Sequence, residues 1–101
     1  MNWPFEDPPN VAVFTTKKIA ARQQPVLLVT HDDDDGAWQF LPREGAGEDQ
    51  DAAIVSLRSM IERDATLAQL ADLPLGWRAW RESPDSPWNR KRSTVVDSPE
   101  S

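Results

Sequence analysis

The ten residues from Asp72 to Arg81, Asp-Leu-Pro-Leu-Gly-Trp-Arg-Ala-Trp-Arg, constrain the fold of this 101-residue chain more than any other segment. Pro74 and Gly76 predict the end of a helix, because proline lacks the N–H that a helix needs and glycine adopts the positive φ that often follows the last turn. Residues 76–82 then alternate in type with a period of two, which is typical of a strand. A short helix is therefore expected to end just before a strand that carries two of the five tryptophans.

The alternation assigns the two tryptophans to opposite faces of this strand. Trp77 and Ala79 point to one face, and Arg78, Trp80 and Glu82 point to the other. A small residue such as Ala79 suits a face on which a helix lies close to the sheet. We therefore expect Trp77 to belong to the core and Trp80 to be partly exposed.

Earlier in the chain, three segments rich in β-branched and aromatic residues predict strands, namely 11–16, 25–31 and 37–41. The second is apolar on both faces, so we expect it to be central in the sheet. Asp35-Gly36 predicts a hairpin turn before the third strand. On that strand Trp38 and Phe40 share one face, which we expect to face the core.

Residues 88–92 predict one more short strand, which returns beside 76–82 after a turn at 83–87. The register of this pairing decides whether Trp88 stacks on Trp80 or lies over Arg81, because a shift of one residue exchanges the two faces. The sequence leaves this register open.

The segment 51–63 fits two structures. Ile54, Leu57 and Ile61 form the stripe of an amphipathic helix, with Asp51 as an N-cap. Ile54 and the β-branched Val55 are equally suited to a short strand, with the helix beginning near Ser56. The second half is predicted helical and the first half is left open. A further short helix over 65–71 is expected to begin at an Asp64 cap.

These elements indicate a single α+β domain over residues 10–92, with a small, mostly antiparallel sheet of four to five strands packed against one or two short helices. Residues 1–9 contain three prolines and predict a flexible N-terminal tail, and residues 93–101 predict a disordered, acidic C-terminal tail. Cysteine is absent, so tryptophan and aliphatic side chains must supply the core without disulfides.

Charge is unevenly distributed along the chain, whose net charge is −6. Residues 31–51 contain eight acidic residues and one base, whereas residues 76–92 contain five bases and two acids. Overall acidity argues against binding to DNA or to an anionic membrane. Neither a long apolar stretch nor a secretory leader is evident, so a cytoplasmic location is expected.

The order of several motifs resembles a family of small uncharacterised bacterial proteins, some relatives of which are filed as immunity proteins of bacterial toxin systems. The matching segments are His31-Asp-Asp-Asp-Asp-Gly-Ala-Trp-Gln-Phe-Leu41, Val55-Ser-Leu57, Ile61 with Asp64, Ala71-Asp-Leu-Pro-Leu-Gly-Trp77 and Arg81. The resemblance spans residues 11–92 and implies a small α+β domain with a protein-binding role. It also favours a short strand at Ile54-Val55, and it assigns no catalytic residue.

The acidic run Asp32, Asp33, Asp34 and Asp35 offers carboxylates of the kind that hard cations bind. Consecutive residues rarely converge on one ion, and the 12-residue calcium-loop pattern is absent, so we expect a solvated hairpin tip and no metal site. His31 lacks a serine, cysteine or second histidine in any recognisable catalytic motif, and we expect it to be structural or exposed. No cofactor is predicted.

The C-terminal third combines tryptophans with basic residues, a composition compatible with three roles. It suits a protein hot spot, a platform for single-stranded nucleic acid, or a core with a solvated rim. The candidate partner-binding residues are Arg78, Trp80, Arg81 and Trp88, joined by the acidic Asp32, Asp33, Asp34 and Asp35; Arg90, Lys91 and Arg92 complete the basic set.

The sequence thus predicts a non-enzymatic, cytoplasmic protein-binding domain, a monomer or weak dimer, that neutralises or regulates a protein partner. An alternative is a small-ligand-binding protein or enzyme that uses His31 with Asp32 or Glu62, which requires a pocket lined by His31 and a carboxylate of perturbed pKa. A second alternative is weak binding of single-stranded nucleic acid, against which the net negative charge of the chain argues.

Overall fold

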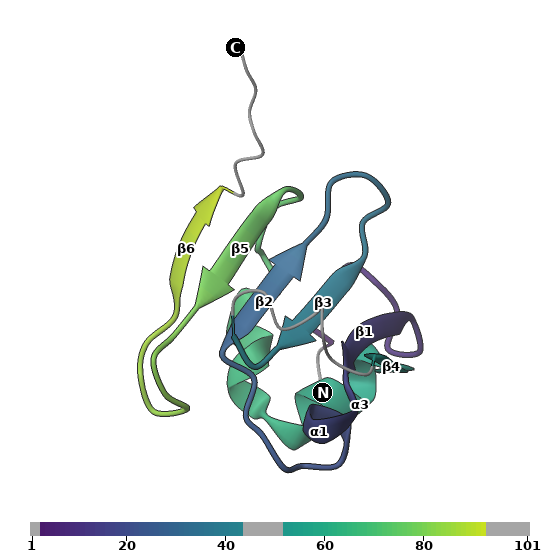
Figure 1. Ribbon diagram of the computed structural model, residues 1–101. Coiled ribbons are helices and arrows are strands. Elements are labelled where there is room, and N and C mark those ends of the chain that lie inside the picture. Colours follow the sequence, from purple (N-terminus) through teal and green to yellow (C-terminus); the bar gives the residue numbers. More distant parts are fainter. Residues whose placement is uncertain (1–2, 44–51, 93–101) are drawn as a thin grey trace.

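The computed structural model describes residues 3–43 and 52–92. Its elements in chain order are β1 (Ala12–Thr16), α1 (Lys17–Ala20), β2 (Leu28–His31), β3 (Trp38–Leu41), β4 (Ala52–Ser56), α3 (Leu57–Arg63), the 3₁₀ helix η1 (Ala65–Leu70), β5 (Trp77–Trp80) and β6 (Asn89–Arg92). Figure 1 shows them around one continuous sheet.

The sheet has six strands in the order β4-β1-β3-β2-β5-β6. β1 and β3 are parallel, and every other neighbouring pair is antiparallel. The predicted α+β class is confirmed, and β2 is central as expected, but the predicted four to five strands become six. The parallel pair arises because β2 runs opposite to β1, and the hairpin then reverses β3 again beside β1.

The additional strand is β4, from the segment that the sequence left open. Ile54 pairs with Phe14 and Val55 with Val13, which places β4 at the edge of the sheet. The helix α3 begins immediately after it, where the Ser56 hydroxyl accepts a hydrogen bond from the Ser59 amide at 3.1 Å. Ser56 is thus the N-cap of α3, a position at which serine is favoured.

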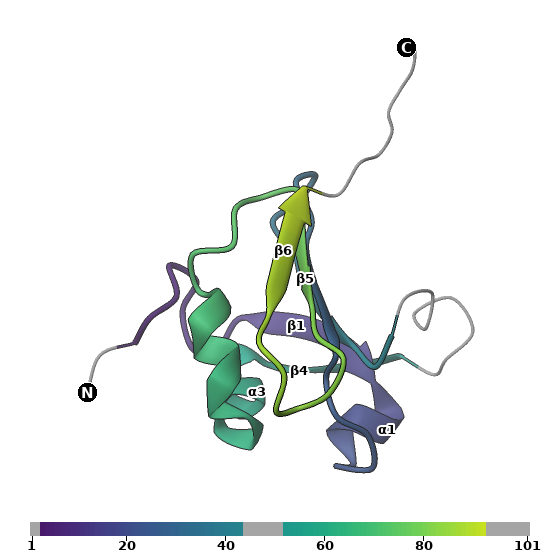
Figure 2. The ribbon, with the colours of Figure 1, turned by 90° about the vertical axis from the view of Figure 1, so that its left-hand side faces the viewer.

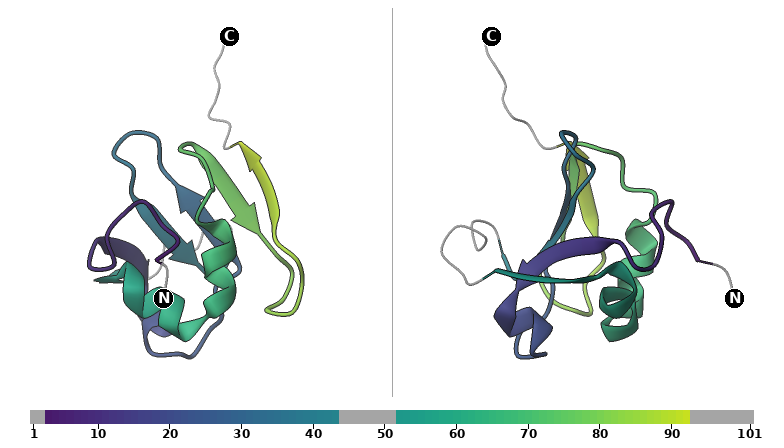
Figure 3. Two further views of the ribbon diagram at one scale, coloured as in Figure 1. Left: turned by 180° about the vertical axis from the view of Figure 1, so that it is seen from behind. Right: turned by 90° about the vertical axis from the view of Figure 1, so that its right-hand side faces the viewer.

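The helices α3 and η1 lie together against one face of the sheet, as the view from behind in Figure 3 shows. Figure 2 shows that β1 and β4 cross the molecule at a steep angle to β5 and β6, so the sheet is strongly twisted around this layer. Ala79, fully buried on β5, allows the close approach predicted for it. The buried hydrophobic residues of the core cluster are Phe5, Val13, Ile19, Val26, Val29, Trp38, Phe40, Leu57, Met60, Leu67, Leu70, Leu73 and Ala79.

The N-terminal segment packs into this core, so the predicted flexible tail is wrong for residues 3–9. Phe5 is 5% exposed, and its ring meets that of Trp38 edge-on with centroids 5.3 Å apart. The Trp38 indole N–H also donates to Asp7 at 2.8 Å. Local composition missed this because the partner of Phe5 lies more than thirty residues away. The remaining tail residues, 1–2 and 93–101, lie outside the described part of the chain.

A short helix that the sequence did not predict, α1, connects β1 to the loop before β2. Thr16 caps it by accepting a hydrogen bond from the Ile19 amide at 3.2 Å. It ends at Ala20, with Ala21 as its C-cap, and the next residue, Arg22, has a φ of +64°. None of the helices in residues 3–43 and 52–92 is both long and apolar enough to cross a membrane.

Candidate functional site

The face of β5–β6 that points away from the helices carries the half-buried Trp80. The strand register pairs Trp80 with Asn89 and Arg78 with Lys91, so all four side chains share this outer face. The Lys91 ammonium lies 5.6 Å from the centroid of the Trp80 ring, within the range of a cation–π contact. β6 is exposed along its whole length. We call Arg78, Trp80, Asn89 and Lys91 the outer ribbon.

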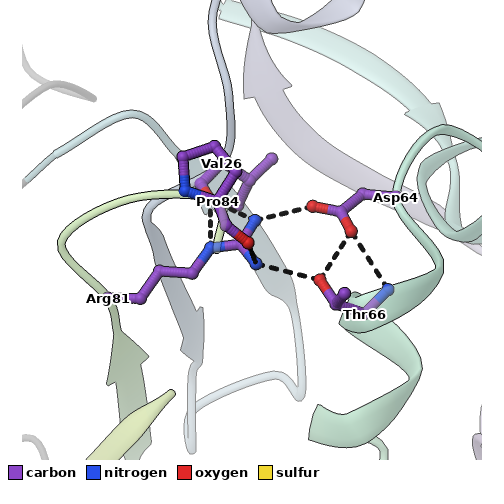
Figure 4. Close-up of polar contacts among 5 residues, drawn as sticks. All are labelled: Val26, Asp64, Thr66, Arg81 and Pro84. Carbon is purple, nitrogen blue, oxygen red and sulfur yellow. Dashed lines mark hydrogen bonds and ion pairs between the residues drawn. The ribbon is translucent and has the colours of Figure 1, made fainter. Parts of the chain in front are cut away.

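Arg81 does not belong to this surface, although the sequence grouped it with the partner-binding residues. It is 3% exposed, and its guanidinium is enclosed by acceptors from three segments (Figure 4). Nε and Nη2 donate to the Val26 carbonyl at 3.1 and 2.9 Å, and Nη2 also donates to Asp64 at 2.6 Å. Nη1 donates to the Thr66 hydroxyl at 2.9 Å and to the Pro84 carbonyl at 3.2 Å. The role of Arg81 is therefore to join segments of the fold.

The contacts with Arg81 and Thr66 shift the pKa of the Asp64 carboxyl. Burial raises its pKa, but the hydrogen bonds from Thr66 and Arg81 and the charge of Arg81 outweigh burial and hold the pKa below its ordinary value. Asp64 also caps η1 by accepting from the Thr66 amide at 3.0 Å, as the sequence predicted for this residue.

Trp88 lies over Arg81 and not on Trp80, which answers the register question. The Arg81 guanidinium carbon is 4.2 Å from the centroid of the Trp88 ring. Trp88 is half-buried and packs against the core. Its ring therefore covers the buried guanidinium, and only its exposed part is available to a partner.

The other basic residues of β6 divide between the two faces. Arg90, opposite Ala79, points to the helix side, where it donates to the Gln69 carbonyl and to Asp72, both at 2.8 Å. The hydrogen bond and charge of Arg90 lower the pKa of Asp72. Arg92 pairs with Trp77 and lies at the end of the strand. Lys91 is thus the basic residue that β6 contributes to the outer ribbon.

The acidic run forms the predicted hairpin tip between β2 and β3. The Gly36 amide donates to the Asp32 carbonyl at 3.0 Å, and the Ala37 amide donates to the Asp35 carboxylate at the same distance. Burial and the charges of the neighbouring aspartates raise the pKa of Asp32. In the part of the chain that the structure describes, no group of three potential ligands is arranged to hold a metal ion. The other acidic residues of 31–51, at 44, 48, 49 and 51, lie outside the described ranges.

The acidic tip and the end of the basic strand are neighbours in space, a relation that the sequence left open. His31, which precedes the tip, pairs with Trp77, and Trp77 pairs with Arg92 in the next strand. The Gly76 amide donates to the His31 carbonyl at 2.7 Å and ties the turn before β5 to the tip. In Figure 1 the tip and the end of β6 lie at the same end of the sheet.

His31 also lines a cavity of about 360 Å³, together with Glu6, Asp7, Asp72 and Leu75. Its Nδ1 donates to the Leu73 carbonyl at 2.8 Å, because a carbonyl oxygen can only accept. The ring stacks on Trp38 with centroids 3.8 Å apart. The sequence could not place Glu6 and Asp7 here, because it assigned them to a flexible tail.

Three comparisons with known proteins, covering family models, curated proteins and solved structures, found no match to this chain. The resemblance to a family of small bacterial proteins therefore stays a prediction.

Proposed function

We propose that this chain is a non-enzymatic protein-binding domain that neutralises or regulates a protein partner. The observation that carries the proposal is that one sheet presents both regions: the acidic tip lies beyond His31 at one end of β2, and the outer ribbon runs along β5 and β6 from there to Trp80, which pairs with Leu28 at the other end of β2. One partner surface can contact both regions together.

The outer ribbon has the composition of a binding hot spot. Trp80 is half-buried on a face that points away from the helices, and tryptophan and arginine are enriched among the residues whose loss weakens protein complexes most. An indole beside Lys91 offers a large apolar area without the entropy cost of ordering a long chain. A partner that covers Trp80 gains apolar burial at the centre of the contact.

The two charged regions favour a partner of complementary charge distribution. Asp33, Asp34 and Asp35 are exposed at the tip, and Lys91 and Arg92 are exposed at the end of β6. Opposite charges across an interface accelerate association and fix its orientation. We infer a partner that presents a basic patch to the tip and an acidic patch to β6, which agrees with neutralisation of a basic protein such as a nuclease.

The test measures the affinity of the chain, and of its variants, for the partner protein that co-purifies with it. We expect Trp80→Ala to weaken the complex by about thirtyfold, the equivalent of a hot-spot loss of about 2 kcal/mol. Asp34→Lys should mainly slow association and reduce its salt dependence. Arg58→Ala is the matched control, because Arg58 is exposed on α3 and paired with Glu62 at 3.0 Å. Equal affinity of all four proteins would contradict the proposal.

A second candidate function is binding of a small cation in the cavity beside His31. The volume of about 360 Å³ lies within the range of small-molecule sites, and its carboxylates favour positive charge. Asp72 stays ionised because Arg90 lowers its pKa, so the cavity suits binding better than proton donation. Calorimetric titration with putrescine tests this function, with His31→Asn as the variant; absence of heat from wild type would exclude putrescine-like ligands.

A further inference from the structure

A second cavity has a volume of about 460 Å³. In Figure 1 the segments that line it lie at the end of the sheet opposite to the β2–β3 turn. Its walls come from the loop after α1, the end of α3 and the turn after β5. The lining residues that matter here are Arg22, Gln24, Val26, Met60, Arg63 and Pro84. The cavity shares no residue with the outer ribbon or with the acidic tip, so it is independent of the proposed function.

Arg63, the last residue of α3, carries buried hydrogen-bond donors that are not used. Its Nε and Nη1 are shielded from solvent and have no hydrogen-bond partner within residues 3–43 and 52–92. An arginine keeps its charge under all ordinary conditions, so burying its donors without an acceptor is unfavourable. The carboxylate next in sequence, Asp64, accepts from Arg81 and Thr66 instead.

Arg22 brings a second cation to the cavity at a position where glycine is usual. The Arg22 amide donates to the Ile19 carbonyl at 2.9 Å, and the Gln23 amide donates to the Lys18 carbonyl at 2.8 Å. This pair of bonds is the Schellman motif, in which the residue at the position of Arg22 adopts positive φ. Arg22 is the one non-glycine residue of 3–43 and 52–92 with positive φ. Strained residues of this kind cluster at ligand sites.

Neither of these guanidinium groups is neutralised by the described residues. Among residues 3–43 and 52–92, Arg22 is not a member of the ion pairs Arg58–Glu62, Arg81–Asp64 and Arg90–Asp72. The Oε1 of Gln24, also in the wall, is buried and has no hydrogen-bond partner among the residues that the structure describes. Rotating this amide by half a turn presents its NH₂ group to the same space.

The cavity is held in shape by the Arg81 cluster. Val26, Asp64 and Pro84 all line it, and all three accept hydrogen bonds from the Arg81 guanidinium (Figure 4). A wall fixed before binding lowers the entropy cost of binding. The exposed rings of Pro25 and Pro84 add an apolar surface beside the two cations.

From these observations we propose that this cavity binds a small organic phosphate, with Arg22 and Arg63 donating to the phosphate oxygens and the apolar wall holding the organic body. Guanidinium groups match the oxygens of phosphate in pairs. The Arg63 guanidinium turns toward the cavity to engage the anion. The phosphate oxygens then accept hydrogen bonds from its Nε and Nη1. The volume exceeds the need of a free phosphate ion, so the ester is the preferred ligand.

The test is calorimetric titration with phenyl phosphate, inorganic phosphate and, as the uncharged control, phenol. We expect phenyl phosphate to bind with a Kd below about 1 mM and at least about tenfold more tightly than inorganic phosphate, whereas phenol should not bind. Equal affinity for both phosphates would support the anion site but overturn the role of the apolar wall. No heat from either phosphate up to about 10 mM would overturn the whole proposal.

Two variants assign the binding to the named residues. Arg63→Met removes the unpaired donors and keeps an unbranched apolar stem, and Arg22→Gly removes the positive-φ strain, so neither should unfold the protein. Each should weaken phenyl phosphate at least about tenfold. Arg58→Met on the same helix is the matched control and should bind as wild type does. Undiminished binding by the double variant would show an adventitious anion only.

Discussion

Replacing Arg81 with alanine tests whether one buried guanidinium joins the C-terminal strands to the helical layer. Arg81 directly follows β5, and its acceptors lie before β2, at the start of η1 and in the turn before β6. The substitution removes all of these bonds and the guanidinium that lies over the Trp88 ring. It leaves the Val26 carbonyl and the Asp64 carboxylate without their donor.

The expected loss of stability follows from the acceptors that Arg81→Ala leaves without a donor. Removing one partner of a buried ion pair costs about 3–5 kcal/mol. The Asp64 side chain is 26% exposed, so water partly replaces the lost donor and moves the figure to the lower end. We expect Arg81→Ala to lower the free energy of unfolding by about 3 kcal/mol. Arg81→Lys keeps the charge but cannot serve the separate acceptors together, and it should cost about 1–2 kcal/mol.

Urea unfolding monitored by circular dichroism measures this difference in the free energy of unfolding, and it does not depend on the fluorescence of Trp88. A double-mutant cycle with Asp64→Ala should give a coupling energy of at least about 1 kcal/mol, because the two side chains are in direct contact at 2.6 Å. A loss below about 1 kcal/mol for Arg81→Ala, with an unchanged m-value, would show that the Arg81 guanidinium does not join the C-terminal strands to the helical layer.

Three further predictions follow from single positions. Gly76→Ala should cost about 1–2 kcal/mol in urea unfolding, because Gly76 has φ +80° and an added Cβ would lie 3.3 Å from an Asp33 carboxylate oxygen; wild-type stability would contradict this. Arg22→Gly should stabilise the fold by about 1 kcal/mol in the same assay by relieving its φ of +64°, and a loss of stability would contradict it. Because the folded-state pKa of Asp32 is raised, its ionised form destabilises the fold, and this penalty disappears as pH falls through that pKa. Asp32→Asn should therefore have a higher Tm than wild type at pH 7, with the gap closing near pH 3, and a gap that widens on acidification would contradict the assigned sign.

The strands of this fold could be predicted where local pattern decides them. The period-two alternation of 76–82 correctly placed Ala79 in the core and Trp80 on the other face. The same alternation places Arg81 on the inward face of the strand, which is also the face of Ala79. Grouping Arg81 with its basic neighbours by composition ignored that signal. An arginine at an inward position indicates a buried acceptor set, and here that set includes Asp64.

Features set by distant contacts could not be predicted from local pattern. β4 exists because Ile54 and Val55 pair with β1, about forty residues earlier, and their composition alone fits helix equally well. Phe5 is buried by Trp38, whereas its neighbouring prolines suggested a tail. The positive φ of Arg22 had no sequence signal either, because arginine is rarely found at that position. The candidate anion cavity depends on it and so was also missed.

The most direct test of the proposed function is site-specific photo-crosslinking in cells that express the protein. A photoreactive phenylalanine analogue is placed in turn at Trp80, at Asp34 and, as the control on the helix side, at Arg58. We expect the first two positions to give an adduct with the same partner protein and the third to give none. Absence of an adduct at Trp80, or identical adducts at all three positions, would contradict the proposed function.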